Sequence, residues 1–547
     1  MKNINVKLVF YRTLFSQSAA SVTMGSLSAF LSNNKINNNL VLLEKNNFHS
    51  IESIFENINS KTVIIAKPNF KDYYQMLQLL SEIKKYNLVN KIFLCGPYAS
   101  LNYNSLMKEL KWLDGIIIGN AEETAVELLE LLEKRTFNCN CPGGVWRNSK
   151  NGVVSVYYPR KYKLKLNNLP FPDRTIEKHE NGSYINIEAS RGCPGACSFC
   201  HIPLLSRLNG INNVDYRDPL LVVDEIEFLF KNLGKKLFIF NDSCFWRSHN
   251  DDKRILKICS EIKKRKLSIK FYIYLKCSPF PSDDILKKMV ESGLVRVFLG
   301  VENHSQTSKT LFNKKIKEGT YELIKEKLDK YHVNVHIGFI IFEPYASINE
   351  VSKNIKYLKK IGKLFRIGVF LEKVRIIPYS ILHKKLIKDG LINKSLSYKD
   401  ITYGYKFRDK KTEEYYKLVK EVFSVILKEQ SYEFEYYCTT VGLIKDILYR
   451  FDNKNFKRLN EDFLEFKLYQ DKIEKLIYVF LIKSIKSIKT LDANKIIKEK
   501  KSSYFIRDFN KLYYMIKVKY ANIFSKINQI NNGEYVKLIY SGYEQIK

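Results

Sequence analysis

Short apolar segments alternate with amphipathic stretches over the first 132 residues, and this rhythm constrains the fold more than any other feature. The amphipathic stretches predict helices, and they lie at 24–34, 73–85 and 122–134. The apolar segments predict strands, and they lie at 5–12, 40–45, 61–68, 91–97 and 113–120. Strands that alternate with helices form a parallel sheet covered on both faces. Residues 1–132 are therefore expected to form a doubly wound, Rossmann-like domain, with ligands at the carboxyl ends of its strands.

A second alternation covers residues 183–396. Its predicted strands are 184–190, 236–242, 270–277, 295–302, 335–342 and 373–378. Helical patterns lie between them, for example at 219–233 and 348–361. A complete eight-unit barrel usually needs about 250 residues. Six strand–helix units in a shorter stretch favour a partial (β/α)6 barrel.

The remaining segments have weaker patterns. Residues 133–182 are rich in Asn, Gly and Pro, with a hairpin signal at Asn151-Gly152. Pro170 and Pro172 favour an extended path, so this segment is predicted to be a connector between two domains. Residues 397–547 have mostly helical patterns and would cover the substrate. The predicted fold class is α/β, with a doubly wound domain, a partial barrel and a mostly α-helical C-terminal region.

The formal net charge of +34 raises the question of a nucleic-acid partner. The last 147 residues carry 29 basic and 19 acidic side chains, close to their even share of that charge. Because no basic arm stands out, RNA is an alternative substrate and not the favoured one. No apolar run approaches the roughly 18 residues of a membrane span. The N-terminus does not resemble a signal peptide either, so the sequence predicts a cytoplasmic protein.

Cys193, Cys197 and Cys200 form the one tight cysteine group in the sequence, with C-x3-C-x2-C spacing. Three thiolates on one loop can each bind a different iron of a cubane cluster and leave the fourth iron open. The alternative is a zinc site completed by His201 or by a distant cysteine, because structural zinc normally takes four protein ligands. The loop follows the first predicted barrel strand, on the face where barrel enzymes keep their chemistry.

The cysteine spacing, with Phe199 just before the last cysteine, resembles the signature of the radical S-adenosylmethionine (SAM) superfamily. The resemblance covers about 181–395. It extends to the segments 216–229, 240–245, 298–303, 338–351 and 375–380. It implies that the three cysteines ligate a [4Fe–4S] cluster whose unique iron chelates SAM. An electron donor such as flavodoxin or ferredoxin would reduce the cluster, and cleavage of SAM would give a 5′-deoxyadenosyl radical.

The same resemblance implies roles in SAM binding. Phe199 would pack near the adenine, and Glu302 would hold the ribose hydroxyls. Asn241 and Asp242 lie where many relatives bind the methionine amino group, although the usual Gly-Gly-Glu is absent. Lys276, at the end of the third strand, would contact the SAM carboxylate.

The N-terminal segments 24–31, 91–100 and 113–124 resemble the cobalamin-binding domain that often precedes this type of barrel. Gly96, Pro97, Gly119 and Glu122 would then lie near cobalamin. They are equally ordinary turn and helix-cap residues, and an acid such as Glu122 complements a helix dipole. The motif Asp-x-His-x-x-Gly, which supplies a histidine to cobalt in some of these domains, is absent. The domain is therefore either a cobalamin site or an empty scaffold.

Three other cysteines are candidate hydrogen donors. Cys244 and Cys277 are predicted at the carboxyl ends of the second and third barrel strands, and Cys438 lies in the C-terminal region. The alternative role for each is that of a small buried apolar residue.

The sequence thus predicts a radical SAM enzyme that functionalises a C–H bond of a peptide or small natural product. With cobalamin, the reaction would be C-methylation. The alternatives are an RNA-modifying radical SAM enzyme, a cobalamin-independent peptide epimerase or rearrangement enzyme, and a non-catalytic scaffold with a vestigial cluster.

Overall fold

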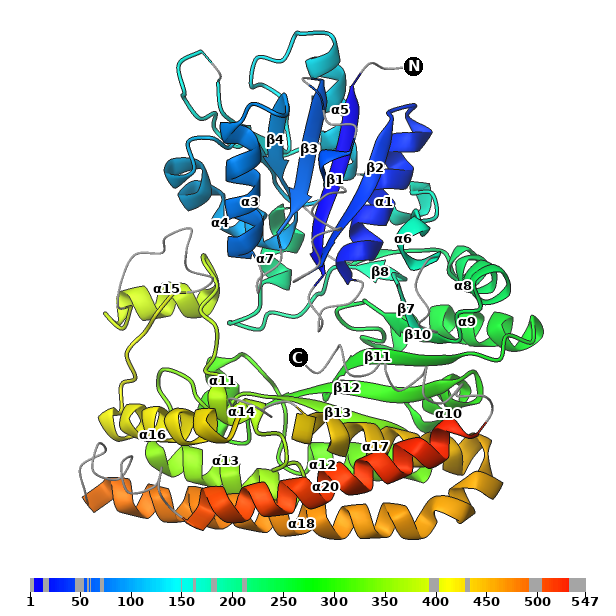
Figure 1. The fold of residues 1–547 in the computed structure, drawn as a ribbon, viewed down its shortest axis with the longest axis vertical. Coiled ribbons are helices and arrows are strands. Elements are labelled where there is room, and N and C mark those ends of the chain that lie inside the picture. The colour runs from blue at the N-terminus through cyan, green and yellow to red at the C-terminus, as the bar shows by residue number, and fades with distance from the viewer. Residues whose placement is uncertain are drawn as a thin grey trace.

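A computed structural model describes most of the chain (Figure 1). The described residues are 4–12, 19–44, 54–56, 59, 61–68, 73–148, 150–160, 164–178, 184–208, 214–392, 403–427, 433–490 and 504–530. The N-terminal sheet lies at one end of the molecule, the barrel strands lie in the middle, and long C-terminal helices lie at the other end. Within the described ranges, no helix is long and apolar enough to cross a membrane.

The N-terminal sheet has six strands in the order β2-β1-β3-β4-β5-β6. The strands are β1 (Asn5–Arg12), β2 (Asn38–Glu44), β3 (Thr62–Lys67), β4 (Lys91–Leu94), β5 (Gly115–Ile117) and β6 (Gly144–Trp146). All neighbours are parallel except β5 and β6. The strand order reverses between β1 and β3, so the crevice at their carboxyl ends is the expected ligand position.

Helices cover both faces of this sheet, as the sequence predicts. They are α1 (Ala19–Asn33), α3 (Tyr73–Lys85), α4 (Gly96–Glu109) and α5 (Glu122–Glu133). One apolar core lies under α1 and α5, and another lies under α3 and α4. Because both faces are covered, a strand such as β3 is buried along its whole length. The helix α4 was not among the expected elements, although Pro97 stands in its first turn, where proline is favoured.

The connector adds structure of its own. It supplies β6 as an antiparallel edge strand, and the predicted hairpin at Asn151-Gly152 is present. Further on, the Asp173 backbone N–H donates to the Gly25 carbonyl at 2.9 Å, and Ser28 donates to the Asp173 carboxylate at 2.7 Å. A side chain on Gly25 would lie 2.5 Å from the Asp173 carbonyl oxygen. Glycine there lets the connector pack directly on α1.

The barrel sheet has five parallel strands in the order β13-β12-β11-β10-β7. They are β7 (Tyr184–Ile187), β10 (Leu237–Phe240), β11 (Lys270–Lys276), β12 (Leu294–Glu302) and β13 (Asn334–Phe339). The sixth expected strand, 373–378, is reduced to one parallel bridge between Lys373 and Phe342. Next in this segment, Ile376 pairs with Tyr403 instead of with the barrel, so the ladder does not continue.

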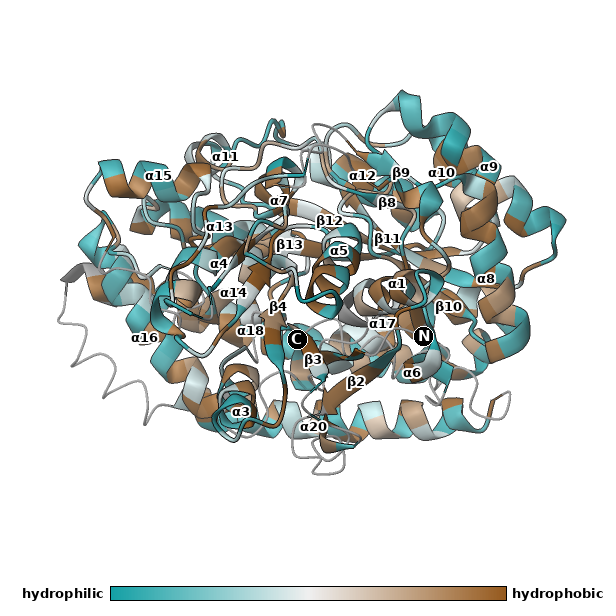
Figure 2. Ribbon diagram, turned by 90° about the horizontal axis from the view of Figure 1, so that it is seen from above, coloured by the Kyte–Doolittle hydropathy of each residue, from teal (hydrophilic) through white to brown (hydrophobic). Residues whose placement is uncertain are grey.

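Helices pack outside the barrel strands. They include α8 (Pro219–Leu233), α9 (Asp252–Lys264), α10 (Asp283–Glu291), α12 (Thr320–Lys330) and α13 (Ile348–Lys360). Figure 2 shows hydrophilic and hydrophobic patches along α8 and α9, as expected of helices with one buried face. Residues at the two ends of α8 determine where this helix begins and ends. Asp218 caps its first turn, Pro219 begins it, and Gly234 adopts the left-handed conformation at its end.

Long helices form the C-terminal region, as predicted. They are α16 (Lys410–Leu427), α17 (Glu433–Phe451), α18 (Asn453–Thr490) and α20 (Tyr504–Asn528). Their apolar faces join the barrel in one continuous core. Helix α17 lies against β12 and β13, and Arg450 donates to the Leu294 carbonyl at 2.6 Å. These helices are therefore part of the barrel's packing, whereas the N-terminal sheet has cores of its own.

Candidate active site

The cysteine loop, residues 192–201, joins the short strand β8 (Ser190–Arg191) to α7 (Ile202–Leu208). Gly195 lies between two of the thiols: an added Cβ would be 3.2 Å from Cys193 Sγ and 4.0 Å from Cys197 Sγ. Its backbone N–H donates to Cys193 Sγ at 3.4 Å. The loop thus folds around its sulfur atoms and provides a donor that would stabilise a thiolate.

Burial raises the pKa of Cys197, and it raises the pKa of Cys200 to about 11. Iron binding requires the thiolate, so metal loading would release protons here. In the part of the chain that the structure describes, no three His, Cys, Asp or Glu side chains converge closely enough for a single metal ion. The three thiols fit a cluster in which each binds a different iron. His201 is neutral, because burial lowers its pKa to about 4.

A cavity of about 550 Å³, here called the barrel cavity, opens beside the loop. Among its lining residues are Phe199, Cys200, His201, Phe298, Arg366 and Glu435. The Phe199 ring packs edge-on against Phe312 with 4.9 Å between ring centroids. Arg366 donates to the Glu435 carboxylate at 2.8 Å, which brings α17 to the cavity wall. The wall therefore combines aromatic rings with the ion pair of Arg366 and Glu435 and with that of Arg375 and Glu372.

Glu302 ends β12 in a left-handed conformation, with φ of 65°. Lys314 donates to its carboxylate at 3.0 Å, and the Lys314 charge also acts on the Cys197 thiol. Two glycines, Gly300 and Gly338, pair across β12 and β13 and lie beneath this carboxylate. A Cβ on Gly300 would lie only 2.8 Å from a Glu302 oxygen. The strained backbone and the two glycines place a carboxylate beside the cysteine loop, where the sequence predicts a SAM-binding acid.

The other expected SAM contacts differ in their surroundings. Asn241 is half-buried, and its side chain lines a second cavity, described below. Asp242 is fully buried, and its carboxylate accepts from the Ala189 N–H at 3.0 Å and from the Ser190 hydroxyl. Its oxygens thus hold the start of the cysteine loop. Lys276 is half-buried at the end of β11, near Cys244.

The second cavity, of about 290 Å³, lies between the N-terminal sheet and the barrel and is here called the interdomain cavity. All four expected cobalamin-site residues line it: Gly96, Pro97, Gly119 and Glu122. The two glycines have φ of 86° and 82°, so they form tight turns after β4 and β5 that a side chain would strain. Glu188, Arg191 and Gly192 line it from the barrel side.

Two carboxylates and two cations, Lys67 and Arg191, line the interdomain cavity, and both carboxylates contact Arg191. Its Nε donates to both carboxylate oxygens of Glu188 at 2.9 Å, and its Nη1 lies 2.9 Å from Glu122. Arg191 stands two positions before Cys193. Its contact with Glu122 thus ties the N-terminal domain to the start of the cysteine loop. Lys67, at the end of β3, also lines this cavity and is 8% exposed.

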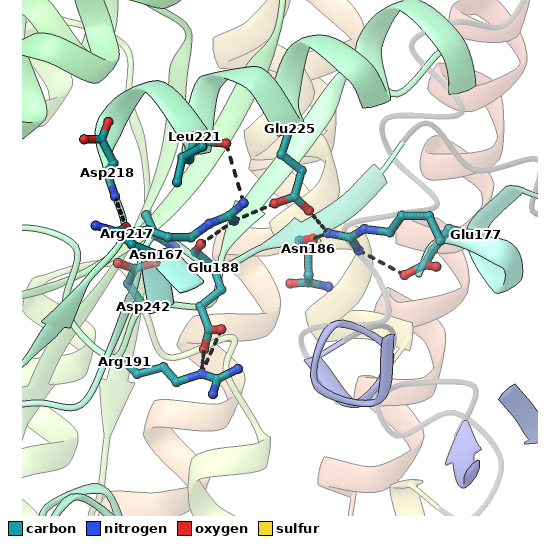
Figure 3. A network of polar contacts seen from close by, with 12 residues as sticks. Asn167, Glu177, Asn186, Glu188, Arg191, Arg217, Asp218, Leu221, Glu225 and Asp242 are labelled. Carbon is teal, nitrogen blue, oxygen red and sulfur yellow. Dashed lines mark hydrogen bonds and ion pairs between the residues drawn. The ribbon is translucent and has the colours of Figure 1, made fainter. Parts of the chain in front are cut away.

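A buried ion network lies behind the cysteine loop (Figure 3). Glu225 of α8 accepts from Arg174 and from Arg217, each at 2.5 Å. Burial alone would raise the pKa of Glu225, but the two guanidinium groups outweigh it and hold the pKa below the ordinary value. Arg174 belongs to the connector and also donates to the Asn186 carbonyl of β7. The network therefore fixes the connector, β7 and α8 together.

The three candidate thiols are not among the lining residues of either cavity. Cys244 donates to the Trp246 carbonyl at 2.9 Å, and Cys277 approaches the Gly300 carbonyl at 3.5 Å. Cys438 is buried in α17. Burial raises the pKa of all three thiols. Their role as hydrogen donors stays a prediction.

Sequence reasoning missed Lys67, Arg191 and Lys314. Lys67 follows directly on the apolar segment of β3, so its position at a strand end was a usable signal. Arg191 precedes the cysteines by two positions, but its partner Glu122 is 69 residues away in the sequence. No local pattern marks Lys314 as the partner of Glu302.

Comparison with known proteins identifies the central region. Residues 187–363 match the model of the radical SAM superfamily. These residues therefore form a radical SAM domain. Its three cysteines, at the start of the matched region, stand where the sequence predicts the cluster.

Curated relatives match over part of their length. An anaerobic magnesium-protoporphyrin IX monomethyl ester cyclase of Rubrivivax gelatinosus is 28% identical over 251 residues, which is 44% of this chain and 44% of that protein. An uncharacterized methyltransferase of Pyrococcus horikoshii is 25% identical over 303 residues, or 53% of this chain and 63% of that protein. This chain thus spans less than two thirds of the length of either relative.

Two solved structures share the fold. The cobalamin-dependent SAM radical enzyme OxsB, with aqua-cobalamin and SAM bound, has a TM-score of 0.64 and 16% identity, and the match covers 100% of this chain and 84% of that one. The radical SAM methyltransferase TsrM of Kitasatospora setae, with tryptophan and a SAM analogue, has a TM-score of 0.56 and 15% identity, covering 70% and 76%. At these identities the likeness establishes the fold alone.

Proposed function

We propose that this chain is a cobalamin-dependent radical SAM enzyme that methylates a carbon of a peptide or small natural product. It would bind a [4Fe–4S] cluster through Cys193, Cys197 and Cys200. When bound, the cluster and SAM supply a carbon-centred radical, and cobalamin supplies the methyl group. A low-potential one-electron donor such as flavodoxin or ferredoxin would reduce the protein in the cytoplasm.

The observation that carries this proposal is the position of the cysteine loop between two cavities. Gly192, at its start, lines the interdomain cavity, whereas Cys200 and His201, at its end, line the barrel cavity. A single cluster on this loop would thus be near ligands in both cavities. Methyl transfer and radical formation would both start from SAM. An enzyme that uses SAM in both ways needs this proximity.

The residues divide into two groups. On the barrel side, Phe199 would contact the adenine and Glu302, held by Lys314, would accept hydrogen bonds from the ribose. On the interdomain side, the turns at Gly96 and Gly119 would admit a corrin close to the backbone. Asn241 lines that cavity next to the loop, and Lys276 remains the candidate for the SAM carboxylate. Asp242 would act by positioning, because its oxygens hold Ala189 and Ser190.

The positions of the three candidate thiols favour methylation over epimerisation. A hydrogen donor must reach the product radical, and Cys244, Cys277 and Cys438 are buried outside both cavities. RNA modification has only the net charge in its favour.

The test is anaerobic reconstitution of the full chain with iron, sulfide and hydroxocobalamin, followed by desalting. About four irons and about one corrin per chain are expected. Adding SAM and a low-potential reductant should then give methylcobalamin and 5′-deoxyadenosine. Four irons without retained corrin would overturn the cobalamin part, and an iron-free chain would overturn the whole proposal.

A further inference from the structure

Three rings on neighbouring strands cross one face of the barrel sheet. They are Tyr274 of β11, Phe298 of β12 and His336 of β13, here called the aromatic row (Figure 1). The strand register pairs Tyr274 with Phe298 and Phe298 with His336, so all three side chains point to the same face. The residues before and after each ring are buried, whereas the rings keep part of their surface accessible. This face therefore borders open space inside the barrel.

The aromatic row lies beside the carboxylate expected to hold the SAM ribose. The next pair toward the carboxyl ends is Gly300 with Gly338, and neither adds a side chain above the rings. A Cβ on Gly338 would lie 3.0 Å from Phe298 Cζ and 3.5 Å from Glu302 Oε2, so the ring and this carboxylate are neighbours. Phe298 and Gly338 also line the barrel cavity. A substrate has to lie next to SAM, and the aromatic row has that position.

The rings of the row stack on one another and stand upright on the sheet. Phe298 and His336 are stacked at 23° with 5.1 Å between ring centroids, and the Tyr274 centroid lies 5.2 Å from that of Phe298. These distances are close to the spacing of neighbouring strands, so the rings turn their edges into the barrel. A ring edge carries partial positive charge and attracts the electron-rich face of another unsaturated ring. The row therefore favours a flat unsaturated group above it.

His336 adds a hydrogen-bond donor in a fixed position. Arg296 Nη2 lies 3.1 Å from His336 Nδ1, and because a guanidinium only donates, Nδ1 accepts and the ring hydrogen stands on Nε2. Burial, together with the charges of Arg366, Arg296 and Lys363, holds the pKa of His336 well below its usual value, so the ring is neutral. Within the described ranges, Nε2 has no hydrogen-bond partner and remains accessible. A ligand that displaces water from Nε2 must therefore bring an acceptor.

The opposite end of the row carries a second polar atom. The Tyr274 hydroxyl has no hydrogen-bond partner among the described residues and is likewise accessible. Burial raises the pKa of Tyr274, so this group is a neutral hydroxyl that can donate or accept. The row thus offers an apolar centre with one polar atom at each end.

We propose that the aromatic row binds the substrate and selects a flat unsaturated ring that carries an acceptor oxygen, a carboxylate or a carbonyl. The substrate oxygen accepts from His336 Nε2, and its ring lies over the edges of Phe298 and Tyr274. This inference rests on the proposed function and names its substrate class. Arg296 is a positioning residue, because it holds the imidazole in the donating tautomer. No covalent step takes place at the row.

The test is equilibrium dialysis of 2-naphthoate against the full-length protein after reconstitution with iron, sulfide and hydroxocobalamin. His336→Phe keeps a ring and removes the donor, and it should weaken binding about tenfold. Tyr274→Phe removes one hydroxyl and should weaken binding about threefold. The saturated decahydro-2-naphthoate is not flat and should bind to wild type about tenfold more weakly than 2-naphthoate. His249→Phe is the matched control, because the His249 side chain is 78% exposed.

Circular dichroism checks the folding of each variant, and Tyr274→Phe carries the test if His336→Phe does not fold. No binding of 2-naphthoate to wild type, or equal affinities of wild type and each folded variant, would overturn the inference. Normal iron and corrin contents in the same samples would leave the proposed function standing. Equal affinities for the flat and the saturated acid would overturn the selection of a flat ring. A wild-type chain that loses corrin but binds 2-naphthoate through His336 would overturn only the cobalamin part of the proposed function.

Discussion

The two cavities beside the cysteine loop are built in different ways. The barrel cavity has aromatic rings and an ion pair, Arg366 with Glu435, that is complete within the protein. The interdomain cavity has two carboxylates, Glu122 and Glu188, that both contact Arg191, and Lys67 is the second cation near them. The barrel wall therefore combines aromatic rings with charged pairs, whereas the interdomain wall gathers four charged side chains near the start of the cysteine loop.

The largest expected effect comes from replacing one cysteine of the loop that borders both cavities. Cys200→Ala should reduce the iron content of the reconstituted protein to near zero and abolish SAM cleavage, because a cluster loses one of its three ligands. Cobalamin retention should persist, since Cys200 lines only the barrel cavity of the two. Iron analysis and the visible spectrum measure both quantities.

Cys139→Ala is the control for this variant, because Cys139 is a partly exposed connector residue far along the chain from the loop. If Cys200→Ala lost corrin along with iron, the two sites would be one structural unit and the comparison would fail.

The next effect concerns the support behind both cavities. Glu225→Gln should lower the free energy of unfolding by about 3 kcal/mol, because it leaves Arg174 and Arg217 buried with less compensation. Urea denaturation measures the change. Glu227→Gln, on the exposed side of the same helix, should be close to neutral. A near-neutral Glu225→Gln would show that the network of Figure 3 does not hold the connector in place.

A pH dependence tests the buried charge of Lys67 directly. The folded pKa of Lys67, about 8, lies below its ordinary value of 10.5. Between these pH values the unfolded chain binds more protons, so stability rises with pH and the cost of Lys67 is fully present below about pH 8. Wild type should gain about 3 kcal/mol relative to Lys67→Met from about pH 8 to about pH 10.5. Parallel stability profiles for the two proteins would contradict the lowered pKa of a buried Lys67.

The smallest effect is on the barrel side. Glu302→Gln should weaken SAM binding to the cluster-loaded protein about tenfold, since a neutral amide accepts weaker hydrogen bonds than a carboxylate. Equilibrium dialysis of SAM measures this, with the exposed Glu326→Gln on α12 as control. Cobalamin retention should not change. An unaltered SAM affinity would remove Glu302 from the SAM site.

Much of this architecture could be predicted because it is encoded locally. The apolar segment of β3 and the cap residues of α8 act within a few positions, and the C-x3-C-x2-C spacing lies on one loop. The four residues expected near cobalamin do line one cavity, because each follows a strand of the same parallel sheet and carboxyl ends meet at one edge. The prediction of a full sixth barrel strand was wrong. Apolar alternation in a sequence does not distinguish a strand with a continuous ladder from a segment with a single bridge.

By itself, the sequence determined the fold class, the position of the cysteine loop and the residue types available for iron. Periodicity and spacing are properties of neighbouring residues, and these features depend on nothing else. Only the tertiary structure decided that Arg191 reaches Glu122 and that Lys67 is buried near both Glu122 and Glu188. Pairing of charges depends on distances between segments far apart in the chain, and burial sets what an unmatched charge costs.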